Sequence, residues 1–230
     1  MKRAKVLKVL AAVVGSVAML GLALSPIPAL ADAVLDFGVP AGQPSTAHID
    51  YAGDPAPLVG SGIVVGDISG LDTPLHASPP DSPLTCIGCI LNFETGPHTV
   101  GWNWAGGGTI TITGTAEGAS GIVASGILMT GSFDSASVIV EPGGTFKIAG
   151  AAFTDTKDSN LTQYFGLPGG PFAGNFGLNF FASGSPGDAF LSSSVISGDV
   201  TNSVPEPASL LLLGAGLIGL GFWRWKNTRA

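Results

Sequence analysis

Glycine and proline are the residues that most restrict the folds open to this chain. Its 230 residues include 35 glycines and 17 prolines. Both residue types interrupt helices, which argues against a mostly helical protein. Hydrophobic residues still make up 45% of the chain and charged residues 11%, which argues against a fully disordered or coiled-coil chain. We therefore expect one β-rich domain with its own core.

Short apolar and β-branched runs recur between turn residues after residue 86. They predict strands over residues 90–94, 99–104, 108–115, 121–130, 136–140, 145–148, 151–155, 176–182 and 189–196, with turns at the glycines of 106–108, 143–144 and 169–170. Residues 32–85 are proline-rich and predicted to be loop-rich, with their clearest strand at 62–68, and the one predicted helix is 158–165. The strand spacing favours an all-β, antiparallel sandwich or barrel over a β-solenoid, because no fixed motif repeats.

Charge is distributed unevenly along the chain. Residues 1–31 hold four basic residues and no acid, and residues 204–230 hold three basic residues and one acid. Residues 32–203 hold fifteen acids but only Lys147 and Lys157, a net charge of −13. This balance argues against nucleic acid as a partner, since binding a polyphosphate needs a basic surface. The sequence therefore predicts an acidic domain, residues 32–203, between two basic, apolar ends.

Residues 1–31 have the organisation of a secretory signal peptide. Four basic residues are followed by an uncharged run over residues 9–24 and by the small residues Ala29 and Ala31. This is the order of basic region, apolar region and A-x-A cleavage site. The run is also short for a membrane span, which needs about 20 residues. We expect a signal helix, export by the Sec machinery and cleavage after Ala31.

Residues 204–230 contain three successive parts. Val204, Pro205, Glu206 and Pro207 come first, residues 208–223 are uncharged, and Arg224, Lys226 and Arg229 follow. Sixteen residues form about 24 Å of helix, and the basic residues can act as a membrane stop on the cytoplasmic side. We therefore predict a single C-terminal transmembrane helix over about 208–223, with residues 32–203 outside the inner membrane. The two prolines keep the approach to this helix extended.

This three-part tail resembles the PEP-CTERM sorting signal of Gram-negative bacteria, which is sometimes called an ice-binding protein C-terminal domain. The resemblance covers residues 204–230 and depends on Val204, Pro205, Glu206 and Pro207. It implies recognition of the Pro-Glu-Pro sequence by an exosortase, a membrane-bound transpeptidase. It also implies removal of the tail and transfer of the remaining chain to the cell surface or to the exopolysaccharide matrix.

The two cysteines, Cys86 and Cys89, are separated by two residues. In an exported protein they meet an oxidising compartment, and residues i and i+3 of a β-turn are close enough for a disulfide. A redox pair is an alternative, but it calls for a helix N-terminus to lower the thiol pKa. A zinc site is another, with His76 and His98 as the nearby imidazoles, although their spacing is unusual. We favour a structural disulfide.

Two polar or aromatic patterns suggest ligand surfaces. Trp102 and Trp104 are two residues apart on one predicted strand and therefore share a face. An exposed pair could stack on sugar rings, whereas burial is the usual preference of tryptophan. Threonines at 109, 111, 113 and 115 alternate with isoleucines, as on flat ice-binding surfaces. An outward sheet face of any kind can show the same alternation. We favour core packing for the tryptophans and an ordinary solvated face for the threonines.

Signals for catalysis and for cofactors are missing from the sequence. It contains no G-x-S-x-G, H-E-x-x-H or P-loop pattern. Asp155, Asp158 and Asn160 could contribute oxygen ligands for Ca²⁺, but they lack EF-hand spacing, so we favour a solvated loop and no metal. We expect neither a cofactor nor catalysis.

Three functions are compatible with these features. The first is an exported, exosortase-processed protein with a structural role at the cell surface or in an exopolysaccharide matrix. The second is a secreted module that binds polysaccharide, or more remotely ice. The third, a secreted enzyme, has the least support. We expect the first.

Overall fold

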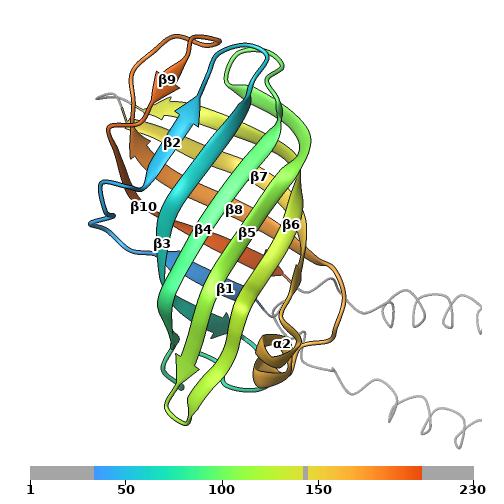
Figure 1. Cartoon of the computed structure of the whole chain (residues 1–230). Coiled ribbons are helices and arrows are strands. Elements are labelled where there is room, and N and C mark those ends of the chain that lie inside the picture. Colours follow the sequence, from blue (N-terminus) through green and yellow to red (C-terminus); the bar gives the residue numbers. More distant parts are fainter. Residues whose placement is uncertain (1–33, 142–144, 204–230) are drawn as a thin grey trace, which may run out of the picture. The chain divides into compact units, whose positions relative to one another are not determined.

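The computed structural model describes residues 34–141 and 145–203 (Figure 1). The predicted signal helix within 1–31 and the predicted transmembrane helix over about 208–223 lie outside the described residues. The elements are β1 (Val34–Val39), β2 (His48–Tyr51), β3 (Pro57–Leu71), β4 (Leu84–Pro97), β5 (Asn103–Gly118), β6 (Gly121–Glu141), β7 (Thr145–Lys157), α2 (Ser159–Phe165), β8 (Phe172–Phe181), β9 (Phe190–Leu191) and β10 (Ser194–Ser203).

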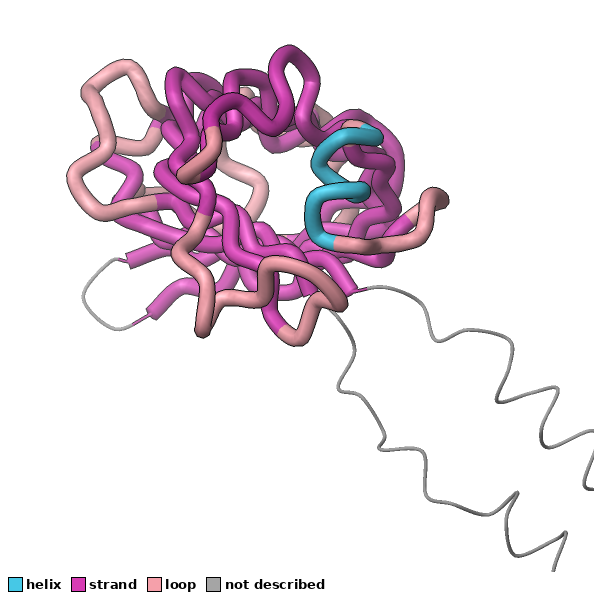
Figure 2. The backbone as a smooth tube through the Cα atoms, turned by 90° about the horizontal axis from the view of Figure 1, so that it is seen from below, coloured by secondary structure: helices cyan, strands magenta, loops and turns pink. Residues whose placement is uncertain are grey.

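The strands form an antiparallel barrel. Their order is β1-β10-β8-β7-β6-β5-β4-β3-β2-β9, and β1 also pairs with β3. This second pairing of β1 closes eight strands into a ring, because β1 then has β10 on one side and β3 on the other (Figures 1 and 2). The short strands β2 and β9 extend from β3 outside the ring. The sequence left a sandwich or a barrel open, and the structure is a barrel.

Large apolar side chains fill the interior of the barrel. Phe37 on β1 lies opposite Ile68 on β3 and Val200 on β10, and Val200 lies opposite Phe176 on β8. All four side chains are fully buried, and the alternate residues of β1 are exposed to a greater degree. Strand alternation therefore directs one side of every strand into a single core.

An aromatic cluster fills the end of the barrel that carries β2 and β9. The Tyr51 ring packs edge-on against Trp104, with ring centroids 5.2 Å apart, and also contacts Phe190 and His98. Trp102 packs edge-on against Phe146. These contacts hold the short β2–β9 pair against the barrel, since two short strands are not stable alone.

The helix α2 covers part of the opposite end, as Figure 2 shows. Asp158 is its N-cap, and its carboxylate accepts hydrogen bonds from the backbone N–H groups of Asn160 and Leu161. Gly166 ends the helix in the left-handed conformation, at φ 70°. Leu161 and Phe165 are buried against the barrel. The predicted helix over 158–165 is confirmed.

Residues 34–85 hold β1, β2, β3 and the start of β4, more strands than the loop-rich prediction allowed. Two other local predictions are wrong, and glycine explains both. Residues 99–102 form the loop between β4 and β5 instead of the start of a strand, and Gly101 adopts a left-handed φ of 66° there. The glycines of 106–108 form a bulge inside β5 instead of a turn. A Cβ on Gly108 would lie 2.0 Å from the Glu94 carbonyl oxygen, so only glycine fits this close approach of β5 to β4.

Candidate functional site

The last three residues of β10 are held firmly in the barrel wall. Ser203 lies opposite Val34 of β1 and Ala173 of β8. Its neighbour Asn202 is 1% exposed and donates a side-chain hydrogen bond to the carboxylate of Asp155. The described strand therefore remains ordered up to the residue that precedes Val204.

A buried ion pair anchors the same end of the barrel. Lys157 Nζ lies 2.5 Å from Asp155 Oδ1, both side chains are fully buried, and the ammonium group lies 4.3 Å from the centre of the Phe172 ring. Burial lowers the pKa of Lys157 to about 8, although Asp155 opposes that shift. Removing either partner would leave a buried charge unpaired, which is costly.

A recess opens beside α2 at this end. Its volume is about 540 Å³, and it is lined by the loop between β3 and β4, the β5–β6 turn and Tyr164 of α2 (His76, Asp81, Ser82, Pro83, Gly118, Ala119, Ser120, Gly121, Val123, Tyr164). We call the loop 72–83, the turn 118–121 and α2 together the α2 end of the barrel.

The polar groups of the recess contact one another. His76 Nδ1 donates a hydrogen bond to Asp81 Oδ2 at 2.9 Å, and its ring stacks on Tyr164 with 4.0 Å between centroids. Burial, and then the Asp81 carboxylate, raise the pKa of Tyr164. His76 has a left-handed φ of 50°, and the backbone N–H of Leu75 donates to the Phe165 carbonyl of α2. Sequence reasoning considered His76 only as a zinc ligand and missed Asp81, because their proximity depends on the folded loop.

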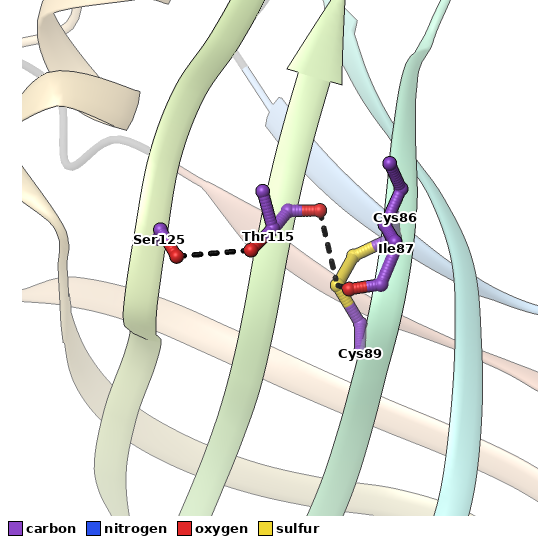
Figure 3. The surroundings of a disulfide bond; sticks show 5 residues. All are labelled: Cys86, Ile87, Cys89, Thr115 and Ser125. Atoms are coloured by element: carbon purple, nitrogen blue, oxygen red, sulfur yellow. Dashed lines mark hydrogen bonds between the residues drawn. A yellow bond between two sulfur atoms is a disulfide. The ribbon is translucent and has the colours of Figure 1, made fainter.

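Cys86 and Cys89 form a disulfide within β4, with their Cα atoms 5.5 Å apart (Figure 3). Cys86 precedes a bulge and Cys89 lies within it, because the pairing of β4 with β5 shifts between Ile87 and Ile90. Gly88 adopts a left-handed φ of 60° in this bulge, which allows the strand to bend and bring Cys86 and Cys89 together. The cysteines are therefore joined in a strand bulge instead of the β-turn expected from the sequence. The Nδ1 atoms of His76 and His98 lie within hydrogen-bond distance of Asp81 and Asp54.

The comparisons with known proteins concern the C-terminal segment. A family model described as the PEP-CTERM protein-sorting motif matches residues 203–226. The chain carries a PEP-CTERM sorting motif. The resemblance found in the sequence is thereby confirmed. The PEP-CTERM motif indicates an exported protein that is targeted to an exosortase and anchored in a membrane before sorting. No curated protein and no solved structure matched the chain.

The PEP-CTERM match begins inside the barrel, because residue 203 is the last residue of β10. The predicted recognition residues Val204, Pro205, Glu206 and Pro207 lie outside the described residues. So do the predicted membrane-stop residues Arg224, Lys226 and Arg229 and the predicted cleavage residues Ala29 and Ala31. No helix within 34–141 or 145–203 has the length and hydrophobicity of a transmembrane span.

The two tryptophans do not form the exposed pair that sugar stacking requires. Trp104 is 1% exposed and lies in the aromatic cluster with Tyr51 and His98. Trp102 is partly buried against Phe146 and Phe190. The favoured core packing is confirmed for Trp104, and a ligand face made from both rings is excluded, because Trp104 gains more from packing in the core than from exposure.

The other polar patterns have structural roles. The four threonines lie on the outer face of β5, and Thr115 shares a hydrogen bond of 2.9 Å with Ser125 of β6. Asp155 lies in β7, is 2% exposed and is paired with Lys157 and Asn202, so the predicted solvated loop is wrong for this residue. Asp158 caps α2 through Oδ1. The described residues contain no group of three or more His, Cys, Asp or Glu placed to hold a metal ion.

Proposed function

We propose that this chain is an exported β-barrel whose tail is removed by an exosortase, and that the barrel then serves a structural, non-enzymatic role at the cell surface or in an exopolysaccharide matrix. The observation that carries this proposal is the PEP-CTERM motif at 203–226, which begins at the last residue of β10. The barrel interior supports a structural role, because it is packed with apolar side chains. The disulfide is in keeping with an oxidising compartment.

Polysaccharide binding through Trp102 and Trp104 has less support. The burial of Trp104 leaves Trp102 as the only ring of the pair with partial exposure. Stacking on a single, partly covered ring buries less sugar surface than stacking on an exposed pair.

Replacement of Glu206 tests the processing step. We expect Glu206→Ala to leave the tail on the chain and to retain the protein in the membrane fraction. Pulse labelling followed by mass spectrometry of the membrane, surface and medium fractions measures both effects. Glu94→Ala is the matched control, since Glu94 is an exposed glutamate of β4. Normal tail removal in Glu206→Ala would overturn the proposal.

A further inference from the structure

The processing enzyme must act very close to the barrel. Glu206 follows Ser203 by three residues, and a fully extended chain advances at most about 3.6 Å per residue. The Glu206 Cα therefore lies within about 11 Å of the Ser203 Cα. Ser203 itself is fixed between β1 and β8. No spacer separates the folded barrel from the recognition sequence.

The α2 end is the surface that such an enzyme meets. Asn202 lies opposite Leu35, and Leu35 lies opposite Gly70, so two strand spacings, or about 10 Å, separate β10 from β3. The Gly70 carbonyl accepts a hydrogen bond from Ser78 N of the loop 72–83 at 2.6 Å. A standard interface covers about 800 Å² on each partner, a disc of about 16 Å radius. A footprint of that size, beginning near Ser203, reaches the loop and the recess.

Charge identifies the kind of partner. The α2 end exposes the apolar side chain of Leu75, at 52%, together with the carboxylates Asp72 and Asp81, and Ile122 next to it in β6 is 69% exposed. The two lysines of the described residues are Lys147 and Lys157, and the Lys157 side chain is fully buried. An acidic end without an exposed lysine repels an anionic lipid surface. It suits a protein face that carries apolar and basic side chains.

The recess fits one basic side chain of that protein. Asp81 lies at its rim with its side chain 48% exposed, and Asp81 Oδ2 accepts the hydrogen bond from His76. The Asp81 carboxylate can therefore pair with an incoming cation through Oδ1, while the exposed His76 ring offers a planar surface. An arginine guanidinium combines both contacts, since it bonds to carboxylates and stacks on flat rings. Such anchors often contribute much of the energy of an interface.

We propose that the α2 end is the docking surface for the exosortase that reads the PEP-CTERM motif, and that the recess between Asp81, His76 and Tyr164 receives a basic side chain of that enzyme. This inference rests on the proposed function. It adds a second, folded recognition element to the linear motif.

The first experiment reverses the charge at the rim. In cells that process the wild-type chain, we expect Asp81→Lys in the full chain to slow tail removal about tenfold, the loss typical of an interface anchor. Pulse labelling measures the ratio of tail-bearing to tail-free chain over time. Asp134→Lys is the matched control, because Asp134 is an exposed aspartate thirteen residues along β6 from the turn at Gly121. An unchanged rate for Asp81→Lys would overturn the proposal.

A second experiment, with an inserted spacer, distinguishes an effect of Asp81→Lys on docking from an effect on folding. Ten Gly and Ser residues inserted between Ser203 and Val204 allow the enzyme to bind the motif without meeting the barrel. We expect Asp81→Lys to lose most of its effect in this longer chain. The same slowing at both spacings would mean that the variant impairs folding or export, which overturns the proposal. Faster processing of Asp81→Lys would indicate attraction to lipid and would also overturn it. Glu206→Ala tests the proposed function separately, because its result does not depend on Asp81.

Discussion

Asp36 occupies an unfavourable site for a charged residue. It lies on β1 between β3 and β10, and its Oδ1 atom is buried without a hydrogen-bond partner among the described residues. Burial first, and then the carboxylates of Asp199 and Asp67, raise its pKa to about 6. The folded state therefore binds a proton more readily than the unfolded state. Asp36 contributes stability below about pH 4 that is lost as the pH rises through about 6.

The first prediction follows from this loss of stability with rising pH. We expect Asp36→Asn to raise the free energy of unfolding by about 1 kcal/mol at pH 8, a value reduced because solvent screens the half-buried carboxylate. At pH 4 we expect almost no change, because the wild-type carboxyl is then protonated in the folded state. Urea unfolding at the two pH values measures the difference. Asp134→Asn, at an exposed site, is the control, and an equal effect of Asp36→Asn at both pH values would contradict the prediction.

His98 forms hydrogen bonds with acceptors through both ring nitrogens. Nδ1 lies 3.0 Å from Asp54 Oδ1, and Nε2 lies 2.9 Å from the Gly101 carbonyl oxygen. Both nitrogens donate only in the imidazolium form. The Gly101 hydrogen bond chiefly, with a contribution from Asp54, raises the pKa of His98 against the opposing effect of burial. The contact is fully stabilising below about pH 6.5, the ordinary pKa of histidine, and is lost as the pH rises through the raised value.

The second prediction concerns this contact. We expect the melting temperature of the wild-type barrel to fall as the pH rises above about 6.5. His98→Gln should lower the free energy of unfolding by about 1–3 kcal/mol at pH 6, because hydrogen bonds of a charged group are lost. The melting temperature of this variant should fall less than that of the wild type over the same pH range. Calorimetry between pH 5 and pH 9 compares the two proteins. His48→Gln controls for loss of a histidine, and identical pH profiles for wild type and His98→Gln would refute the assignment.

At the scale of elements, glycine has two structural roles that the sequence alone did not distinguish. Some glycines end strands, as at the β5–β6 turn between Gly118 and Gly121. Others lie inside strands at bulges or beneath aromatic rings. The runs predicted at 121–130 and 136–140 are therefore one strand, β6, and those at 145–148 and 151–155 are one strand, β7. Alternation predicted the buried isoleucines of residues 109–115, but the strand lengths depend on partners that are distant in sequence.

The third prediction tests a glycine beneath a ring. Gly174 of β8 lies opposite Phe153 of β7, and a Cβ at Gly174 would lie 2.1 Å from Phe153 Cζ. Phe153 is 1% exposed, so its ring has little room to move. We expect Gly174→Ala to lower the free energy of unfolding by about 1–3 kcal/mol through overpacking. Gly169→Ala is the control, because no atom lies within 4 Å of its added Cβ. Equal stability of the two variants in urea unfolding would contradict this packing role.

At the scale of the whole molecule, closure of the barrel is the feature that the sequence could not decide. Alternating strands are common to sandwiches and barrels. The decision depends on β1, which pairs through all six residues with β10, near the C-terminal end of the described chain, and through five with β3, near its N-terminal end. The recess also depends on contacts distant in sequence, because the loop 72–83 and Tyr164 of α2 both line it. The sorting motif, by contrast, is read from consecutive residues, so it could be identified from the sequence.

The fourth prediction places the boundary of the folded unit at Ser203. Each pairing that closes the ring of described strands lies within 34–203, so a chain of residues 32–203 should fold without the tail. A chain that ends at Val200 lacks the last three residues of β10. It also loses the hydrogen bond from Asn202 to the buried Asp155. Loss of support for a buried charge costs about 3 kcal/mol, which lowers the melting temperature by roughly 6–12 °C for a chain of this size.

Calorimetry of purified 32–203 and 32–200 measures this difference directly. Asn202→Ala in the 32–203 chain isolates the hydrogen bond from the loss of strand length, and it should account for about 1–3 kcal/mol of the effect. Equal melting temperatures for 32–203 and 32–200 would show that β10 ends earlier than Ser203. The recognition sequence would then have a flexible approach from the barrel. A large difference instead means that the last three residues of β10 stabilise the barrel, so that removal of the tail at the motif releases a complete, closed barrel.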